Sequence, residues 1–404
     1  MNVNPASPQI ARAINDRMAL DLLIEHGELT APQLKELTGL SRPSVSDLLE
    51  RLQENELIEV VGEAGGKRRG PNAKLYGVIG DRAHVAGVDL RGGAIDVSIA
   101  DLRGITVSSS KRTISDNHSL AALIRRAVAD AGRKVSLDPE QLHTVVIGAP
   151  GFVDQETGDL IPGYEFPGWS DTLFAELVDA LNVPIAFESE VNLAGTAELH
   201  RGAGQGRRDL ALLWLDRSVG ASIIMDGRLR QGASGGAGEV GKFAMPNVSL
   251  PIAGRAAGGL HSLVSASAVR RLALAHRLPE GPLAEVVATA CTTDDHASNE
   301  FVSELAQRIA MGVLGVVAVV DPGLVVLSGD IGLAGDERLA VEVSHYLSAM
   351  DAIETEVASS TVKKLPVVSG AILAALTIAH DDIFGGSREL VAMQQESGDS
   401  EALA

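Results

Sequence analysis

The sequence predicts an α/β protein that begins with a small winged helix-turn-helix. Residues 1–80 hold three helical segments followed by two short β-rich runs around a basic, glycine-rich stretch. From Val85 onward, apolar runs of strand length alternate with helical segments, a pattern typical of parallel strands joined by helices. At 404 residues the chain is long enough for two or three domains.

The N-terminal helices carry start and stop signals. Apolar residues recur at helical spacing over residues 10–24, which predicts a first amphipathic helix. Thr30 is placed to cap a short helix, APQLKELT, which Gly39 ends, and Ser41 is placed to cap the next helix, SRPSVSDLLERLQENEL. Two short helices joined by a tight glycine turn predict a helix-turn-helix.

The second helix of this motif supplies candidates for DNA contact. In a helix-turn-helix the N-terminal residues of the second helix face the major groove. The candidates for base and phosphate contact are therefore Ser41, Arg42, Ser44 and Ser46. The buried stripe of the same helix is expected to be Val45, Leu48, Leu49 and Leu52. The alternative is a plain helical hairpin with a solvated charge cluster.

The residues after the helices predict a wing. The runs at 57–61 and 74–78 are short and rich in β-branched or aromatic residues, and they flank a basic glycine-rich loop. On that loop, Lys67, Arg68 and Arg69 would reach phosphates or an adjacent minor groove. Winged modules can also serve protein contacts, and that alternative stays open.

The rest of the chain predicts two groups of strands. The first group is expected to begin with a hairpin that starts at Val85 and turns at 91–93, followed by single strands at 144–151 and 184–190. Helices are expected between these strands, at 119–133 and 170–181. Further strands are expected at 210–216 and 220–227. The second half is expected to be mostly helical apart from a strand at 324–330 that runs into a glycine turn.

Composition narrows the class of protein. The net charge of −19 argues against non-specific nucleic-acid binding by the whole surface. Cys291 is the only cysteine, which excludes an internal disulfide and fits a reducing compartment. The first residues lack the apolar segment of a signal peptide, and the longest apolar run, 311–320, is shorter than a bilayer span. We therefore expect a cytoplasmic protein without a membrane partner.

Several motifs occur together in one order along the chain. They are GVDLRGG at 87–93, VIGAPGFVD at 146–154, ESEVNLAGTAE at 188–198, VGASIIMDGRLRQGASGGAGEVG at 219–241, DPGLVVLSGDIG at 321–332 and SGAILAAL at 369–376. With the winged head before them, the chain resembles a regulator of the ROK family, which unites bacterial repressors and sugar kinases. The resemblance implies a two-lobed actin-like (ribonuclease H-like) sugar-kinase fold with a ligand cleft between the lobes.

The resemblance also implies a division into domains. Residues 1–80 form the winged helix-turn-helix, 81–195 the first lobe and 196–404 the second lobe. The C-terminal helix is expected to return to the first lobe.

The two glycine-rich turns that hold ATP phosphates in the family's kinases are altered here. The first reads DLRGG over 89–93, with Arg91 in a glycine place, and the second reads DRSVG over 216–220. Phosphate turns need residues without side chains so that backbone N–H groups can approach. An arginine and an aspartate in these places imply that the chain is not an enzyme and uses no nucleotide cofactor.

The family's zinc site is also altered. The histidine of its G-E-x-G-H motif is replaced by Lys242, and the loop that follows has no cysteine. An ammonium group cannot join a cysteine-histidine zinc site, so we expect no metal and no other cofactor. Lys242 is equally well interpreted as an ordinary solvated lysine.

The family's sugar contacts can be carried over by position. They fall on Glu188, Ser189, Glu190, Asn192, Glu239 and His261. Their carboxylate, amide and imidazole groups suit the paired O–H groups of a carbohydrate. Ser189 and His261 depart from the family's asparagine and glutamate, so glucose itself is not implied. Structural roles remain open for Glu188, Glu239 and His261.

Glu190 stands where the kinases keep the aspartate that deprotonates the sugar. A base there is useful only if a phosphate lies in line with the sugar hydroxyl. We therefore interpret Glu190 as an acceptor for a ligand hydroxyl, with Asn192 shaping the turn.

Together these features predict a DNA-binding transcriptional regulator, a repressor by family default. Its expected partners are operator DNA, a small-molecule effector (a sugar or sugar derivative), and further copies of itself in a dimer or tetramer. Two alternatives stay open. One is an ATP-dependent sugar kinase with a regulatory DNA-binding head, and the other is an effector-independent regulator with a vestigial cleft.

Overall fold

A computed structural model describes the chain over residues 8–64, 73–91, 93–114, 119–154, 157–158, 160–162, 168–170, 172–251, 257–350 and 354–384. The predicted wing-tip residues Lys67, Arg68 and Arg69 lie outside these ranges.

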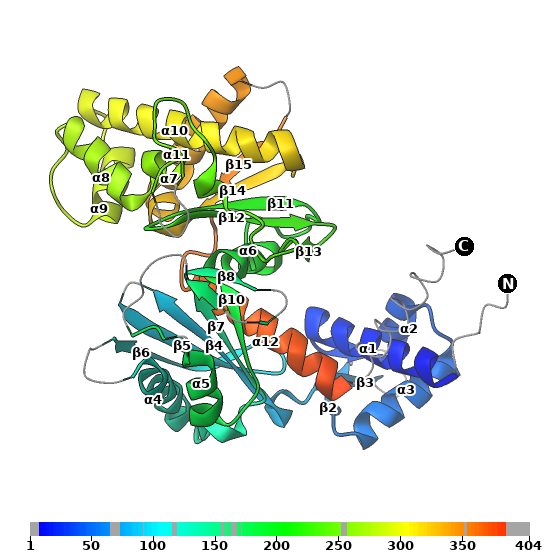
Figure 1. Ribbon diagram of the computed structural model, residues 1–404. Coiled ribbons are helices and arrows are strands. Elements are labelled where there is room, and N and C mark those ends of the chain that lie inside the picture. The colour runs from blue at the N-terminus through cyan, green and yellow to red at the C-terminus, as the bar shows by residue number, and fades with distance from the viewer. Residues whose placement is uncertain are drawn as a thin grey trace, which may run out of the picture.

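The N-terminal head is a winged helix-turn-helix (Figure 1). Its elements are α1 (Pro8–His26), β1 (Leu29–Thr30), α2 (Ala31–Thr38), α3 (Arg42–Glu54), β2 (Ile58–Ala64) and β3 (Ala73–Val78). Thr30 and Gln33 form a capping box at the start of α2, and Gly39 ends α2 in the left-handed conformation at φ 69°. The Ser41 side chain caps α3 by accepting from the Ser44 N–H. The local signals in the sequence thus define both helices.

The head has its own apolar core. The predicted stripe of α3 is buried, as are Leu20 of α1 and Leu34 of α2. The three strands pair in the order β1-β3-β2, with β3 antiparallel to both neighbours. Arg51 of α3 pairs with Asp16 of α1 at 2.5 Å, which joins the recognition helix to the first helix.

The first lobe is built on a mixed sheet of order β10-β7-β4-β5-β6. Its strands are β4 (His84–Arg91), β5 (Ala94–Asp101), β6 (Thr106–Thr113), β7 (Thr144–Ala149) and β10 (Ile185–Ser189). β10, β7 and β4 are parallel, whereas β5 and β6 continue the sheet as antiparallel strands. Helices α4 (Leu120–Gly132) and α5 (Leu173–Leu181) cover one face (Figure 1). A hairpin of β8 (Gly151–Val153) and β9 (Leu160–Pro162) follows β7.

The second lobe repeats the plan with a sheet of order β13-β12-β11-β14-β15. Its strands are β11 (Leu210–Leu215), β12 (Val219–Met225), β13 (Arg228–Leu229), β14 (Leu324–Ser328) and β15 (Glu356–Ser359). Its helices are α7 (His261–Val264), α8 (Ala266–Ala275), α9 (Leu283–Thr292), α10 (His296–Val320) and α11 (Gly329–Met350). Short 3₁₀ turns occur at Gly80–Arg82, Arg133–Val135, Pro139–Gln141 and Val240–Lys242.

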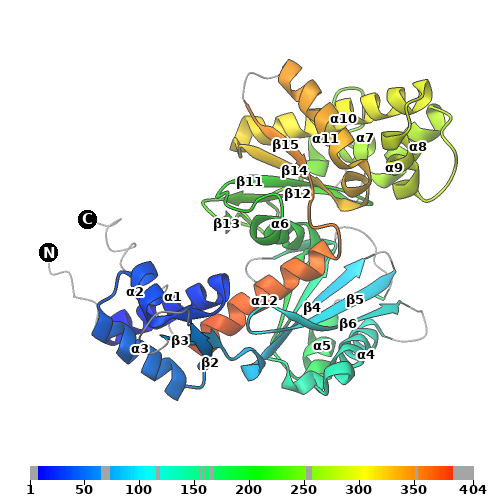
Figure 2. The same ribbon diagram turned by 180° about the vertical axis from the view of Figure 1, so that it is seen from behind.

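Two helices lie between the sheets of the two lobes (Figures 1 and 2). They are α6 (Glu190–Arg201), next to β11 and β12, and α12 (Pro366–Phe384), next to β4 and β7. One hydrophobic cluster runs through this middle layer into both sheets and into the head. The far end of α12 contacts α1, where Asp381 pairs with Arg17 at 2.8 Å. The body and the head therefore share a continuous core.

A buried carboxylate holds the chain where it crosses from the second lobe to α12. Glu198 of α6 is 0% exposed and accepts hydrogen bonds from the Ser360 hydroxyl at 2.5 Å and the Val362 N–H at 2.9 Å. It also accepts from the Ala203 N–H at 2.8 Å. Glu198 therefore satisfies backbone and hydroxyl donors of the crossover, of which Ser360 is fully buried.

Two of the described helices, α10 and α12, are long and apolar enough to cross a membrane by length and composition. About half of each apolar window is buried inside the protein, at 50% and 56%. A helix that is apolar on most sides fits a core position of this kind. The α/β class and the winged head predicted from the sequence are confirmed by these elements.

Candidate functional site

A cavity of about 310 Å³ opens between the two lobes. Its walls come from the β8–β9 hairpin of the first lobe, the start of α6, the turn and strand of β12, the segment 235–242 and the start of α7. Phe152, Ile161 and Pro162 of the hairpin supply an apolar wall. The opposite side carries polar groups.

Five of the six ligand residues predicted from the sequence line this cavity. They are Ser189, Glu190, Asn192, Glu239 and His261. Glu188 does not line it. Its carboxylate accepts from the Asn192 side chain at 3.0 Å, from the Gln231 side chain at 2.7 Å and from the Ser189 N–H at 2.7 Å. Glu188 therefore orients Asn192 toward the cavity, which is the structural role left open for it.

Glu190 is the most unusual group of the cavity. It is the first residue of α6 and only 3% exposed, and its Oε1 accepts from the Ser218 hydroxyl at 3.1 Å. Its Oε2 is buried and has no hydrogen-bond partner among the described residues. Burial raises the pKa of Glu190 to about 8, with Arg91 opposing the rise and Asp89 and Asp216 adding to it. A buried polar atom without a partner calls for an explanation, and in a cavity wall contact with a ligand atom is one.

Stability should depend on the ionisation of Glu190. The folded protein holds this proton more tightly than the unfolded chain, where the pKa is 4.5, so stability falls as the pH rises from about 4.5 to about 8. Glu190→Gln removes this loss, because the amide stays neutral. We expect the variant to become more stable relative to the natural protein as the pH rises across that window, measured by urea unfolding. Asp89, whose pKa burial raises to about 6, titrates in both proteins. An unchanging difference across the window would contradict the assignment.

Glu239, Lys242 and His261 complete the polar wall. The Lys242 ammonium lies 3.0 Å from the Glu239 carboxylate and 6.0 Å from the centre of the Phe152 ring. Lys242 lines the cavity together with its partner, and 55% of its side chain is exposed, so the interpretation as a solvated lysine stays open. Burial lowers the pKa of His261, which favours a neutral imidazole that can donate and accept.

The altered phosphate turns form one ionic cluster. The Arg91 Nε lies 2.8 Å from Asp89 Oδ2, and its Nη1 lies 3.6 Å from Asp216 Oδ2. The guanidinium stacks over the Trp214 ring at 5.0 Å. The side chains of Arg91 and Asp216 thus occupy the two turns that the sequence likens to phosphate-binding turns.

Within the described residues, no cluster of three or more histidine, cysteine, aspartate or glutamate side chains could hold a metal ion. Residues 252–256 of the loop after Lys242 are not among those described. Lys242 itself is engaged with Glu239.

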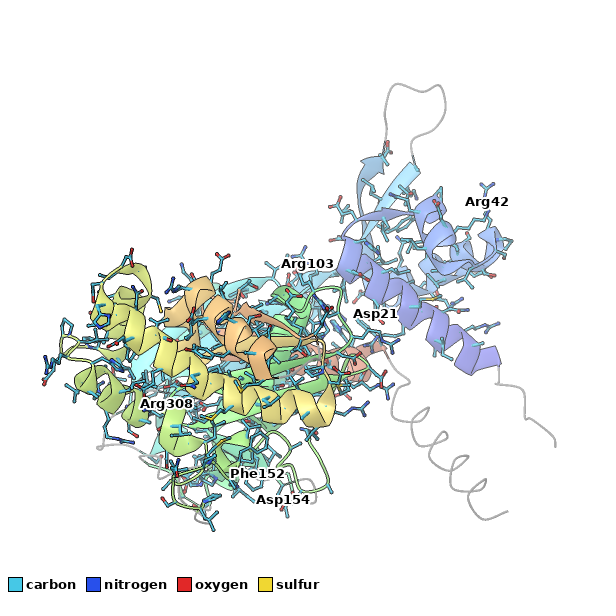
Figure 3. All side chains as sticks on the ribbon, turned by 90° about the horizontal axis from the view of Figure 1, so that it is seen from above. Asp21, Arg42, Arg103, Phe152, Asp154 and Arg308 are labelled. Atoms are coloured by element: carbon cyan, nitrogen blue, oxygen red, sulfur yellow. The ribbon has the colours of Figure 1, made fainter. Side chains whose placement is uncertain are left out.

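The predicted DNA-contact residues of α3 share an exposed surface. Ser41, Arg42, Ser44 and Ser46 are all exposed. Arg42 lies on the part of the head turned away from the two lobes, and Phe152 of the cavity lies well apart from it in the body (Figure 3). A groove of about 1060 Å³ runs between α2, α3 and β3.

Two lysines of this groove were missed as candidate contacts. Lys35 of α2 and Lys74 of β3 line it together with Arg42 and Ser46. The basic segment around the wing was the signal for Lys74. Nothing in the local sequence points to Lys35, because only the packing of α2 against β3 brings it to the groove.

The head and the body of the chain match two different protein families. A model of the ROK family matches residues 85–379. A model of the MarR family matches residues 14–69, the winged head.

Individual relatives include both kinases and regulators. A glucokinase from Halalkalibacterium halodurans is 26% identical over 285 residues, covering 66% of this chain and 86% of the relative. The DNA-binding transcriptional dual regulator NagC from Escherichia coli is 21% identical over 369 residues, covering 86% of this chain and 88% of the relative.

A solved structure covers head and body together. It is a ROK family transcriptional regulator described as a homologue of the E. coli MLC protein, with a TM-score of 0.73 and 19% identity, covering 93% of this chain and 98% of that one. At this identity the likeness shows the fold alone. It confirms the fold class predicted from the sequence, a winged helix-turn-helix followed by a two-lobed sugar-kinase-like body.

Proposed function

The chain belongs to the ROK family, and from this membership we propose that it is a DNA-binding transcriptional repressor whose kinase-like cleft binds an effector without phosphorylating it. The observation that carries the proposal is the joining of a MarR-like winged head to a body whose phosphate turns are filled by side chains. A family kinase needs no DNA-binding head. A regulator needs no phosphate site.

The cavity supports a small hydroxylated effector, a sugar or sugar derivative. Asn192 and His261 can both donate and accept hydrogen bonds, and Glu239 accepts. The free Oε2 of Glu190 adds a buried polar contact. Phe152 adds an aromatic ring to the cavity wall. In number and type, these groups suit a ligand with several hydroxyls.

A packed connection links the cavity to the head. Glu190 begins α6, α6 packs along α12, and the last turn of α12 contacts α1 through Arg17 and Asp381. An effector that prefers one arrangement of the lobes can therefore bias the position of the head. By this proposal, two heads in a dimer or tetramer read two half-sites of an operator in the cytoplasm.

The α3 surface should carry operator binding. If Arg42 contacts a base, we expect Arg42→Ala to weaken operator binding by about 10-fold to 100-fold, or about 1–3 kcal/mol. If Arg42 contacts a phosphate, we expect the slope of log affinity against log salt concentration to fall by about one unit. The probe is a labelled DNA fragment from upstream of the chain's own coding sequence, and the measurement is fluorescence anisotropy over a range of salt.

The matched control is Arg271→Ala, because Arg271 is an exposed arginine of α8 in the second lobe. It should bind the fragment as the natural protein does. Equal affinity of the Arg42→Ala variant and this control would exclude α3 as the reading helix.

Sugar kinase activity is the second candidate, and the glucokinase relative favours it. The Arg91–Asp216 pair speaks against it, because the Arg91 side chain stands in a glycine place of the first turn and the Asp216 carboxylate at the second turn repels a triphosphate. Calorimetric titration with ATP and Mg²⁺, with and without glucose, separates the two. Tight nucleotide binding would establish the kinase and overturn the proposal.

An effector-independent regulator would leave the cavity without a purpose. The unpartnered buried oxygen of Glu190 argues against this, since such an atom is costly unless a ligand satisfies it. A thermal-shift screen of sugars, amino sugars and sugar phosphates tests the difference. A true cleft ligand raises the unfolding temperature with its concentration.

A further inference from the structure

Arg91 contacts carboxylates of both lobes. It is the last residue of β4 in the first lobe, and its Nε lies 2.8 Å and 3.2 Å from the two carboxylate oxygens of Asp89. Its Nη1 lies 3.6 Å from the carboxylate of Asp216, which follows β11 in the second lobe. One cation therefore contacts a carboxylate from each lobe.

The flat guanidinium group suits this place. It lies 5.0 Å from the centre of the Trp214 ring, and Trp214 is fully buried in β11 of the second lobe. Only 21% of the Arg91 side chain is exposed. An arginine can bind carboxylates in the plane of its fork while its face lies on an aromatic ring, whereas a lysine cannot do both.

Carboxyl groups from several elements lie around Arg91. Asp89 faces it from β4 and Asp216 from the end of β11, while Asp96 of β5 acts on Asp89. Glu190 of α6 also acts on Arg91, and Asp330 of α11 acts on Asp216. Two further cations are close to this cluster: Arg217, which acts on Asp216, and Lys111, which pairs with Asp96 at 3.1 Å. Without Arg91, the buried carboxyl groups of Asp89 and Glu190 would lose the cation that acts on both of them.

We propose that Arg91 is a positioning residue of the effector site, a built-in counter-ion that ties the two lobes together next to Glu190. This inference rests on the proposed function for its link to an effector. Arg91 stands at the first of the two altered glycine turns, so the lobes meet around a side chain of the chain itself and need no bound nucleotide. It follows that effector binding should be independent of ATP and should depend on a guanidinium at this point.

Removal and replacement of the guanidinium tests this without knowledge of the effector. We expect Arg91→Gly to lower the unfolding temperature, and millimolar guanidinium chloride to restore part of it in a saturable way. Sodium chloride and methylammonium chloride at equal concentration should not restore it. The same addition should change the fluorescence of Trp214, one of two tryptophans in the chain. The natural protein should show no saturable response.

Arg91→Gln and Arg91→Lys guard against a variant that fails to fold. Both variants keep a long side chain, and both should have a lower unfolding temperature than the natural protein. This includes Arg91→Lys, because an ammonium group cannot replace the contacts of the guanidinium. In Arg91→Gln the stability loss assigned to Glu190 should continue to higher pH than in the natural protein, because the opposing positive charge is gone. If Arg91 only filled space, Arg91→Gln would show the same dependence of stability on pH as the natural protein.

The outcomes separate the two proposals. A saturable guanidinium effect and a shifted pH profile support the counter-ion role whether or not DNA is bound. Variants as stable as the natural protein at every pH, or a guanidinium effect no larger than that of methylammonium, would overturn it. Failure of operator binding alone would overturn the proposed function and leave the role of Arg91 standing as a tie between lobes.

Discussion

Replacing Glu198 with alanine should lower the free energy of unfolding by about 3 kcal/mol, the upper part of the range for leaving buried hydrogen-bond donors unpaired. The carboxylate accepts from Ser360, Val362 and Ala203, and it is fully buried between α6 and the crossover to α12. Urea unfolding followed by circular dichroism measures the loss.

Two further variants define that result. Glu198→Gln keeps one acceptor oxygen and should lose less than the alanine variant. Glu285→Ala removes an exposed glutamate of α9 and should change stability by no more than about 0.5 kcal/mol. If Glu198→Ala were no less stable than Glu285→Ala, the crossover would not depend on the carboxylate.

Gly370→Ala should be the second large effect, with a loss of about 3 kcal/mol, the upper part of the range for overpacked cores. Gly370 lies on α12 where the helix meets α6, and an added Cβ would lie 1.9 Å from the Leu193 carbonyl oxygen. This atom belongs to a helix backbone and cannot rotate away. The two helices would have to separate, which would loosen the layer between the lobes.

Gly281→Ala is the matched control for this change. A Cβ at Gly281 would meet only the Val286 side chain, at an ordinary 3.8 Å. We expect unfolding of this variant to be close to that of the natural protein. Equal stability of the two alanine variants would mean that α6 and α12 are not in close backbone contact.

The head was the most predictable part of the chain. Its helices are set by local signals, namely the caps at Thr30 and Ser41 and the left-handed turn at Gly39. Such signals act between residues three or four apart and can be recognised without the fold. The short strands β15 and β8–β9 were not predicted, because runs of three or four residues give too little periodicity to identify.

The candidate site was predictable in its members but not in its contacts. Position along the motifs placed five of six ligand residues in the cavity wall. The Glu188 side chain accepts a hydrogen bond from Gln231, which lies 43 positions away and in the other lobe. The pairing of Arg91 with Asp216 likewise depends on how the two lobes meet. Long-range contacts of this kind leave no local pattern in the sequence.

The most direct test of the proposed function is operator release by an effector. A mobility-shift assay would use DNA from upstream of the coding sequence at physiological salt, with and without sugars that raise the unfolding temperature. The proposal expects specific binding that one such sugar reverses. It also expects Glu190→Gln to bind the same DNA with unchanged affinity and to resist release. No specific binding by the natural protein, or collapse of DNA binding in Glu190→Gln, would contradict a repressor whose effector contacts Glu190.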